Sequence, residues 1–179
     1  MVFQIKFVTD NKMVLEKLNQ AEIIDLLGSI YEHSPWVAEI LFSQGITSQD
    51  NDVGFLAERM KRIVDTSSQD MKLNLLQAHP ELAGKLSISG KLTKDSTAEQ
   101  ASAGLDQCSK EEFAEFSRLN FEYTKKFGHP FIIAVRGLTR SEILTSFNDR
   151  LDNDSKKEFS TAMGEVHKIA RLRLEQLSM

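Results

Sequence analysis

The feature that most constrains the fold is a recurring helix-start signal. In this signal a Ser, Thr or Asn is followed three residues later by Glu, and apolar residues then recur at helical spacing. The spacing occurs at Asn19 with Glu22, Ser96 with Glu99, Ser109 with Glu112, Thr139 with Glu142 and Ser155 with Glu158. Each pair can form a capping box, in which two side chains satisfy N–H groups of the first helical turn. Strand-like alternation is nearly absent, so the sequence predicts an all-α protein.

Apolar stripes at helical spacing predict about eight helices. They cover approximately residues 19–30, 35–45, 53–64, 71–78, 96–103, 109–127, 139–151 and 155–177. We expect Ser34 to cap the second helix, with Pro35 at its first position. Residues 83–95 read as a polar, basic connection, and such a long loop in a compact domain is often functional. The apolar run Phe131–Val135 is either a buried extended segment or a first helical turn.

Length and composition predict one compact domain over residues 1–179, with residues 1–12 as an irregular N-terminal extension. A net charge of -4 argues against a nucleic-acid surface, because phosphate binding relies on a clustered basic field. No apolar run approaches the ~18 residues of a membrane span. Residues 1–12 do not resemble a secretion signal, and the single Cys108 fits a reducing compartment. We therefore expect a soluble cytoplasmic protein.

His79 is the strongest candidate for acid–base chemistry. It follows the fourth predicted helix and precedes Pro80, which ends that helix. Histidine can exist in either protonation state near neutral pH, which suits a catalytic acid or base. Position alone also allows a simpler role, in which His79 caps the negative end of the helix dipole.

Two further candidates allow both a binding and a structural interpretation. Glu99 and Gln100 could present a carboxylate and an amide to a polar heterocycle, whereas the spacing from Ser96 to Glu99 is explained by capping alone. Arg173 lies on the apolar stripe of the last helix, where a cation needs a partner. That partner could be a substrate carboxylate, a buried Glu or Asp, or water at the edge of the stripe.

The remaining candidates indicate structure rather than chemistry. His33 precedes Ser34, His129 follows a helix-stop glycine, and His167 lies near a polar flank. No pair of histidines has zinc-binding spacing and Cys108 has no thiol partner, so we expect no metal site. Nucleotide-binding glycine motifs and the serine-hydrolase elbow do not occur in the sequence.

Four motifs occur in order, namely Glu32–Glu39 (EHSPWVAE), His79–Leu82 (HPEL), Leu92–Gln100 (LTKDSTAEQ) and Phe127–Gly137 (FGHPFIIAVRG). On these motifs the chain resembles the 2-oxo-4-hydroxy-4-carboxy-5-ureidoimidazoline (OHCU) decarboxylase family of urate breakdown. The resemblance extends from about residue 15 to the C-terminus. It implies an all-helical, cofactor-free enzyme, commonly a homodimer, that releases CO2 and yields (S)-allantoin.

The resemblance also assigns roles to residues. It makes His79 the catalytic histidine and places Glu99 near the reacting centre. It implies substrate binding by the following residues: Pro80, Ser96, Gln100, Phe131, Ile132, Ile133, Ala134, Val135 and, on a weaker match, Arg173. Two other functions remain open on the residues alone: a non-catalytic helical module that binds a ureide or a partner protein, and a hydrolase of the ureide pathway.

Overall fold

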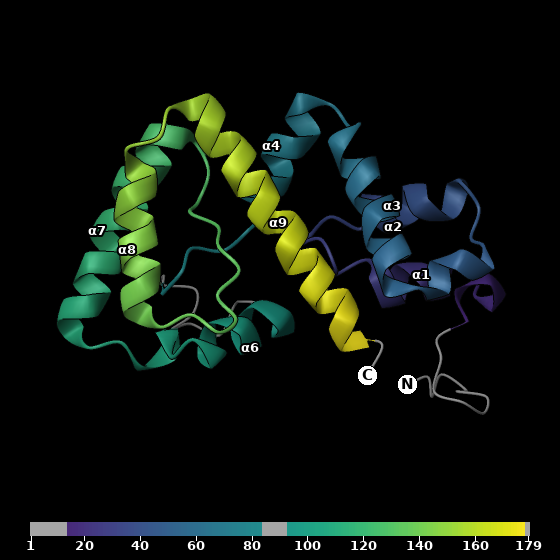
Figure 1. The fold of residues 1–179 in the computed structure, drawn as a ribbon, viewed down its shortest axis with the longest axis horizontal. Coiled ribbons are helices and arrows are strands. Elements are labelled where there is room, and N and C mark those ends of the chain that lie inside the picture. The colour runs from purple at the N-terminus through teal and green to yellow at the C-terminus, as the bar shows by residue number, and fades with distance from the viewer. Residues whose placement is uncertain (1–13, 84–92, 178–179) are drawn as a thin grey trace. The chain divides into compact units, whose positions relative to one another are not determined.

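The computed structural model describes residues 14–83 and 93–177 (Figure 1). In these residues it contains eight α-helices and no strand, which confirms the all-α prediction. The α-helices are α1 Gln20–Leu27, α2 Trp36–Ser43, α3 Val53–Asp65, α4 Gln69–Gln77, α6 Lys94–Ser102, α7 Lys110–Phe127, α8 Arg140–Leu151 and α9 Ser155–Leu177. Short 3-10 helices are η1 Leu15–Lys17, η2 Ser48–Asn51 and η3 Leu105–Gln107. Among the described residues, no helix combines the length and apolar character that crossing a bilayer requires.

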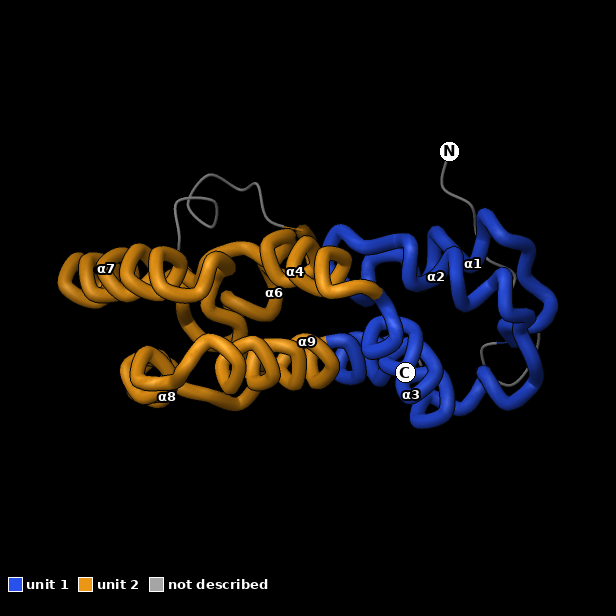
Figure 2. The backbone as a smooth tube through the Cα atoms, turned by 90° about the horizontal axis from the view of Figure 1, so that it is seen from above, with its two compact units in different colours: residues 1–67, 170–179 blue, residues 68–169 orange. Residues whose placement is uncertain are grey.

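The chain divides into two compact units, which Figure 2 shows in different colours. Unit 1 comprises residues 1–67 and 170–179, and unit 2 comprises residues 68–169. Helix α9 contributes its first part to unit 2 and its last part to unit 1. A single domain over residues 1–179 stays a prediction, and the expected extension, residues 1–12, lies outside the described part of the chain.

In unit 1, α2 packs against both α1 and α3. A fully buried carboxylate ties η2 to α3, because both oxygens of Asp50 accept hydrogen bonds from Arg59 Nη1, at 2.7 and 2.6 Å. The same carboxylate accepts the N–H of Thr47 at 2.7 Å, which closes the first turn of η2. This buried ion pair is therefore also hydrogen-bonded, as a charge shielded from water requires.

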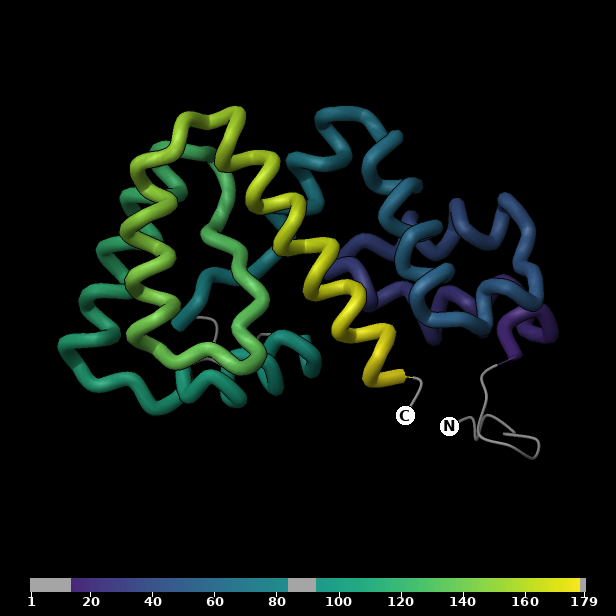
Figure 3. The backbone as a smooth tube through the Cα atoms, in the orientation of Figure 1, coloured from purple at the N-terminus to yellow at the C-terminus, as the bar shows by residue number. Residues whose placement is uncertain are grey.

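Unit 2 is built around an aromatic core between α7 and α8. The ring of Phe131 stacks on Phe147 with 3.8 Å between centroids, and Tyr123 meets both rings edge-on. Helices α7 and α8 run in the same direction, so residues 128–139 return along them before α8 begins (Figure 3). This return places residues 131–135 in the core as an irregular, non-helical segment. Of the two conformations predicted for this run, a buried extended segment and a first helical turn, the helical turn is therefore wrong.

The capping boxes predicted at Asn19, Ser109 and Thr139 are all present, with both reciprocal hydrogen bonds. Helix α7 ends at Gly128, whose φ of +79° lies in the left-handed region that favours glycine. Local sequence signals therefore determine where α1, α7 and α8 start and where α7 ends.

The other three capping predictions are wrong. Thr93, rather than Ser96, caps α6 by accepting the N–H of Ser96. Asp154 caps α9 by accepting the N–H of Lys157, which leaves Ser155 inside the helix. The Ser34 hydroxyl donates to the carbonyl of Glu32, and α2 has no side-chain cap. In α6 the competing Thr93 stands three residues before the predicted cap, and in α9 Asp154 stands one residue before it.

Candidate active site

His79 ends helix α4 through two hydrogen bonds. Its backbone N–H donates to Leu76 O at 3.2 Å, and its ring Nδ1 lies 2.8 Å from Leu75 O. Because a carbonyl only accepts, Nδ1 carries the proton, and the lone pair of the neutral ring is on Nε2. The side chain therefore caps the helix and at the same time has a fixed tautomer. The two interpretations of His79 made from the sequence are compatible in this geometry.

His79 and Pro80 line a groove of about 750 Å³ in unit 2. Its other lining residues are Gln77, Glu81, Ser117, Asn120, Phe121, Thr124, Lys125 and Pro130. Asn120 is 2% exposed and donates from Nδ2 to Leu82 O at 2.9 Å. Its Oδ1 is buried and accepts no hydrogen bond from the described residues. Sequence reasoning missed Asn120, because one asparagine on a helix face gives no signal of its own.

Gln100 joins α6 to the segment that follows His79. Its Oε1 accepts the N–H of Ala83 at 3.1 Å, and its Nε2 donates to Glu81 O at 3.3 Å. Ala83 has φ +48°, a strained conformation for a residue with a Cβ, so this turn needs such support. The structure thus brings the HPEL motif and the predicted substrate-binding helix together, and it uses both amide atoms of Gln100 to do so.

The other predicted residues of α6 lie beside Gln100. Ser96 precedes Gln100 by four residues, so the two share one face of the helix. They are 5% and 4% exposed, whereas Glu99 is half-buried. Helix α6 therefore turns Ser96 and Gln100 inward and leaves the Glu99 carboxylate closer to solvent. The binding and catalytic roles of these three residues stay predictions.

The predicted binding stretch Phe131–Val135 is buried except at Ile133, which is half-buried. The carbonyl of Ile132 accepts from Arg150 Nη1 at 2.8 Å, and the N–H of Ala134 donates to Glu165 Oε2 at 2.7 Å. The Arg150 guanidinium also lies over the Phe131 ring, 4.4 Å from its centroid. Side chains of α8 and α9 therefore fix the path of this irregular segment.

Arg150 is itself held by a buried carboxylate, Glu158, which is fully shielded from solvent. Glu158 accepts hydrogen bonds from Arg150 Nε at 2.9 Å, from Asn153 Nδ2 at 2.6 Å and from the Tyr123 hydroxyl. Burial, together with this contact to Glu158, raises the pKa of Tyr123, so its hydroxyl stays protonated as a donor. The sequence does not reveal this network, because the spacing from Ser155 to Glu158 predicts a capping box instead.

Arg173 belongs to unit 1, where its Nη1 lies 2.8 Å from Glu32 Oε2 and 3.2 Å from Ser29 O. Of the partners considered for this cation, the structure shows a buried carboxylate. Contact between Arg173 and a substrate stays a prediction. Within residues 14–83 and 93–177, no three His, Cys, Asp or Glu side chains gather in a way that could hold a metal ion.

Known proteins resemble this chain over most of its length. The model of the OHCU decarboxylase family matches residues 16–175. A 2-oxo-4-hydroxy-4-carboxy-5-ureidoimidazoline decarboxylase of Halalkalicoccus jeotgali is 41% identical over 172 residues, covering 94% of this chain and 93% of that protein. The protein of the same description from Haloferax volcanii is 39% identical, covering 93% of this chain and 96% of its own length.

Solved structures show the same fold. A crystal structure of (S)-allantoin synthase superposes with a TM-score of 0.71 at 35% identity and covers 91% of this chain. This chain spans about half of that synthase, 52% of its length. A crystal structure of OHCU decarboxylase in the presence of (S)-allantoin gives a TM-score of 0.61 at 25% identity, covering 79% of this chain and 89% of the other. The sequence motifs, the helical fold and these matches together establish that the chain belongs to the OHCU decarboxylase family.

Proposed function

We propose that this protein decarboxylates 2-oxo-4-hydroxy-4-carboxy-5-ureidoimidazoline to (S)-allantoin in urate breakdown. The observation that carries the proposal is the match of residues 16–175 to the OHCU decarboxylase family. His79 lies within this match, in the HPEL motif, and the family resemblance implies that it is the catalytic histidine. The fixed ring of His79, with its proton on Nδ1, supports the same role. The relatives from Halalkalicoccus jeotgali and Haloferax volcanii carry this activity in their names.

The proposed chemistry is cofactor-independent. Breaking the bond between the ring carbon and its carboxylate releases CO2 and leaves an electron pair on that carbon. The adjacent ring C=N bond can take up this pair, so that a C=C bond forms to the carbon that bears the ureido group and the ring nitrogen gains a proton. The hydroxyl group then loses its proton as its carbon becomes a carbonyl, and protonation of the ureido-bearing carbon on one face gives the (S) product. The substrate thus supplies its own electron sink, and the protein has to orient the substrate, stabilise the developing charge and move protons.

His79 is proposed as the acid–base group. In its neutral form the Nε2 lone pair can accept a proton from the substrate hydroxyl or carboxyl group, and the imidazolium can return it. The bond from Nδ1 to Leu75 O supports this role, because it fixes which nitrogen exchanges the proton. Glu99, half-buried on α6, is proposed to tune His79 or to hold a ureido nitrogen.

Main-chain groups of residues 131–135 are the proposed oxyanion donors. Within the described residues, the N–H groups of Ile132, Ile133 and Val135 donate no hydrogen bond. Pre-oriented N–H groups of this kind stabilise negative charge that develops during a reaction. Gln100 and Ser96 are proposed to complete the substrate site from α6. Contact of the Gln100 side chain with substrate would compete with its bonds to Glu81 and Ala83.

We propose further that the protein works as a homodimer in the cytoplasm. The family resemblance supports the dimer, and the single Cys108 supports a reducing compartment. Light scattering during size-exclusion chromatography tests the dimer. A mass of about 40 kDa is expected from a chain of 20.2 kDa, whereas a concentration-independent monomer would contradict it.

The activity is tested by supplying the unstable substrate enzymatically. Urate is mixed with urate oxidase and hydroxyisourate hydrolase, and the circular dichroism signal of (S)-allantoin is followed with and without this protein. The proposal predicts faster growth of the signal than the spontaneous decay gives. If the protein does not accelerate the signal, it is instead a non-catalytic helical module, and His79 only a helix cap.

A further inference from the structure

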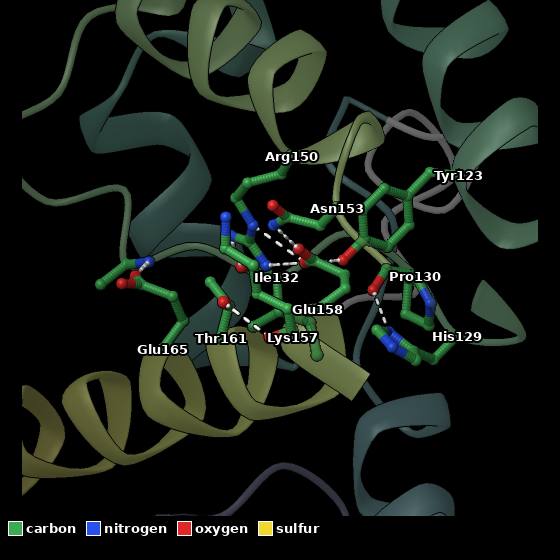
Figure 4. A network of polar contacts seen from close by, with 11 residues as sticks. Tyr123, His129, Pro130, Ile132, Arg150, Asn153, Lys157, Glu158, Thr161 and Glu165 are labelled. Carbon is green, nitrogen blue, oxygen red and sulfur yellow. Dashed lines mark hydrogen bonds and ion pairs between the residues drawn. The ribbon is translucent and has the colours of Figure 1, made fainter. Parts of the chain in front are cut away.

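Two adjacent peptide groups around Ile133 are anchored at opposite ends. The first, between Ile132 and Ile133, is held by its carbonyl, which accepts from Arg150 Nη1 at 2.8 Å. The second, between Ile133 and Ala134, is held by its N–H, which donates to Glu165 Oε2 at 2.7 Å (Figure 4). The anchoring side chains come from α8 and α9, so the segment is fixed by two helices.

These anchors determine where the groups of Ile133 point. The described peptide bonds are trans, and the C=O and N–H of a planar trans peptide point in opposite directions. The N–H of Ile133 therefore points away from Arg150, and its carbonyl points away from Glu165. Neither group makes a hydrogen bond within the described residues, and Ile133 is the one half-exposed residue of the stretch.

The Arg150 side chain is held by contacts that do not involve Glu165. The guanidinium is bonded to the buried Glu158 carboxylate and lies over the Phe131 ring. The other Glu158 oxygen is held by Asn153 at 2.6 Å. Glu165, by contrast, is half-buried and reaches the segment with a single carboxylate oxygen. The orientation of the peptide group between Ile133 and Ala134 thus depends on the Glu165 side chain, which can be substituted to test it.

We propose that Glu165 is a positioning residue, which holds the Ala134 N–H so that Ile133 presents one donor and one acceptor to the amide edge of the ureidoimidazoline. This proposal rests on the proposed function. An amide or ureide edge carries an N–H beside a C=O, which is the complement of the two free main-chain groups of one residue. Main-chain pairing of this kind recognises extended amides in peptide-binding sites.

The test compares Glu165→Ala with Glu165→Gln. Alanine removes the acceptor for the Ala134 N–H, whereas glutamine retains an acceptor oxygen and removes the charge. A lost hydrogen bond to a charged group corresponds to about a tenfold weaker interaction or more. We expect Glu165→Ala to raise KM by about tenfold with kcat within about threefold, and Glu165→Gln to keep KM within about threefold of wild type. Glu122→Ala, an exposed α7 carboxylate paired with Arg118, is the matched control and should leave KM unchanged.

The outcomes separate the two proposals. An active wild type with an unchanged KM in Glu165→Ala would overturn the positioning role. Equal increases in KM for the Ala and Gln variants would overturn it too, because the charge rather than the acceptor would then matter. Amide hydrogen exchange of Ala134 is measured on the same variants and needs no activity. We expect the Ala134 amide to exchange faster in Glu165→Ala than in Glu165→Gln. Equal exchange in the two variants would refute the hydrogen bond from Ala134 to Glu165 as an anchor. An inactive wild type would refute the proposed function and leave this exchange result unaffected.

Discussion

The Arg173 guanidinium lies 2.8 Å from the Glu32 carboxylate, and the two side chains are 3% and 1% exposed. The pair joins the C-terminal part of α9 to the turn before α2 within unit 1. Since both charges are shielded from water, both need compensation, and this contact supplies part of it. Glu32 stands in the EHSPWVAE motif, so one residue of that motif has a structural role that spacing alone did not reveal.

Removing one member of this pair should destabilise the protein strongly. Glu32→Ala removes the carboxylate that lies against the buried Arg173 guanidinium, and we expect the free energy of unfolding to fall by about 3–5 kcal/mol. Arg173→Met should give a similar loss, and the double variant should lose less than the sum of the two. Urea denaturation followed by circular dichroism measures these changes.

The control for this prediction lies on the same helix. Arg171 and Glu175 form an exposed pair at 3.1 Å, and Arg171→Ala should cost less than about 1 kcal/mol. A loss in Glu32→Ala as small as in this control would show that the Arg173 charge is solvated in another way.

Two glycines of unit 2 should respond to alanine with opposite signs. Gly128 ends α7 with φ +79°, so Gly128→Ala should lower the free energy of unfolding by about 1 kcal/mol. Gly164 lies inside α9, and a Cβ there meets nothing within 4 Å. Gly164→Ala should therefore raise stability by about 0.5–1 kcal/mol. Thermal unfolding of both variants checks the prediction, and a shift in the same direction for both would contradict it.

His129 should make stability depend on pH. Its ring is 2% exposed, donates from Nδ1 to Pro130 O at 2.9 Å, and lies among the Tyr123, Phe127 and Phe159 rings. Burial lowers the pKa of His129 below its ordinary value of 6.5, an effect opposed first by the hydrogen bond to Pro130 O and then by Glu158, and reinforced by Arg150. Between the lowered pKa and 6.5 the unfolded chain binds the proton more strongly, so stability is lost as pH falls through this window.

The measurement is the free energy of unfolding as a function of pH from 7.5 down to 5. His129→Asn keeps a donor close to the position of Nδ1 but cannot titrate, so its stability should fall less with acid than that of the wild type. Identical pH profiles for the two proteins would assign the acid sensitivity to other groups.

Local sequence predicted the helices well because helix starts and stops are short-range features. Asn19, Ser109 and Thr139 have their Glu partners three residues on, and those boxes formed. The method failed where two possible caps stood close together, as with Thr93 before Ser96. The family and its fold were also predicted, because four motifs in order are far more specific than any single one.

Long-range pairings could not be predicted in the same way. The bonds from Gln100 to Glu81, from Arg150 to Ile132 and from Glu165 to Ala134 join residues 18 to 31 positions apart in the chain. No periodicity or capping rule relates such positions. Glu158 shows the difficulty, since its spacing to Ser155 suggested a cap while its carboxylate is used in the core.

The most direct test of the central claim separates the two roles of His79. His79→Asn keeps an N–H donor near the position of Nδ1, so the hydrogen bond to Leu75 O can persist while the titrating Nε2 is lost. The rate of (S)-allantoin formation is measured by circular dichroism for wild type and variant, together with the melting temperature. We predict that His79→Asn lowers turnover by about 10²-fold or more with a melting temperature near that of the wild type. Wild-type turnover in His79→Asn would contradict the account and leave His79 as a helix-end residue.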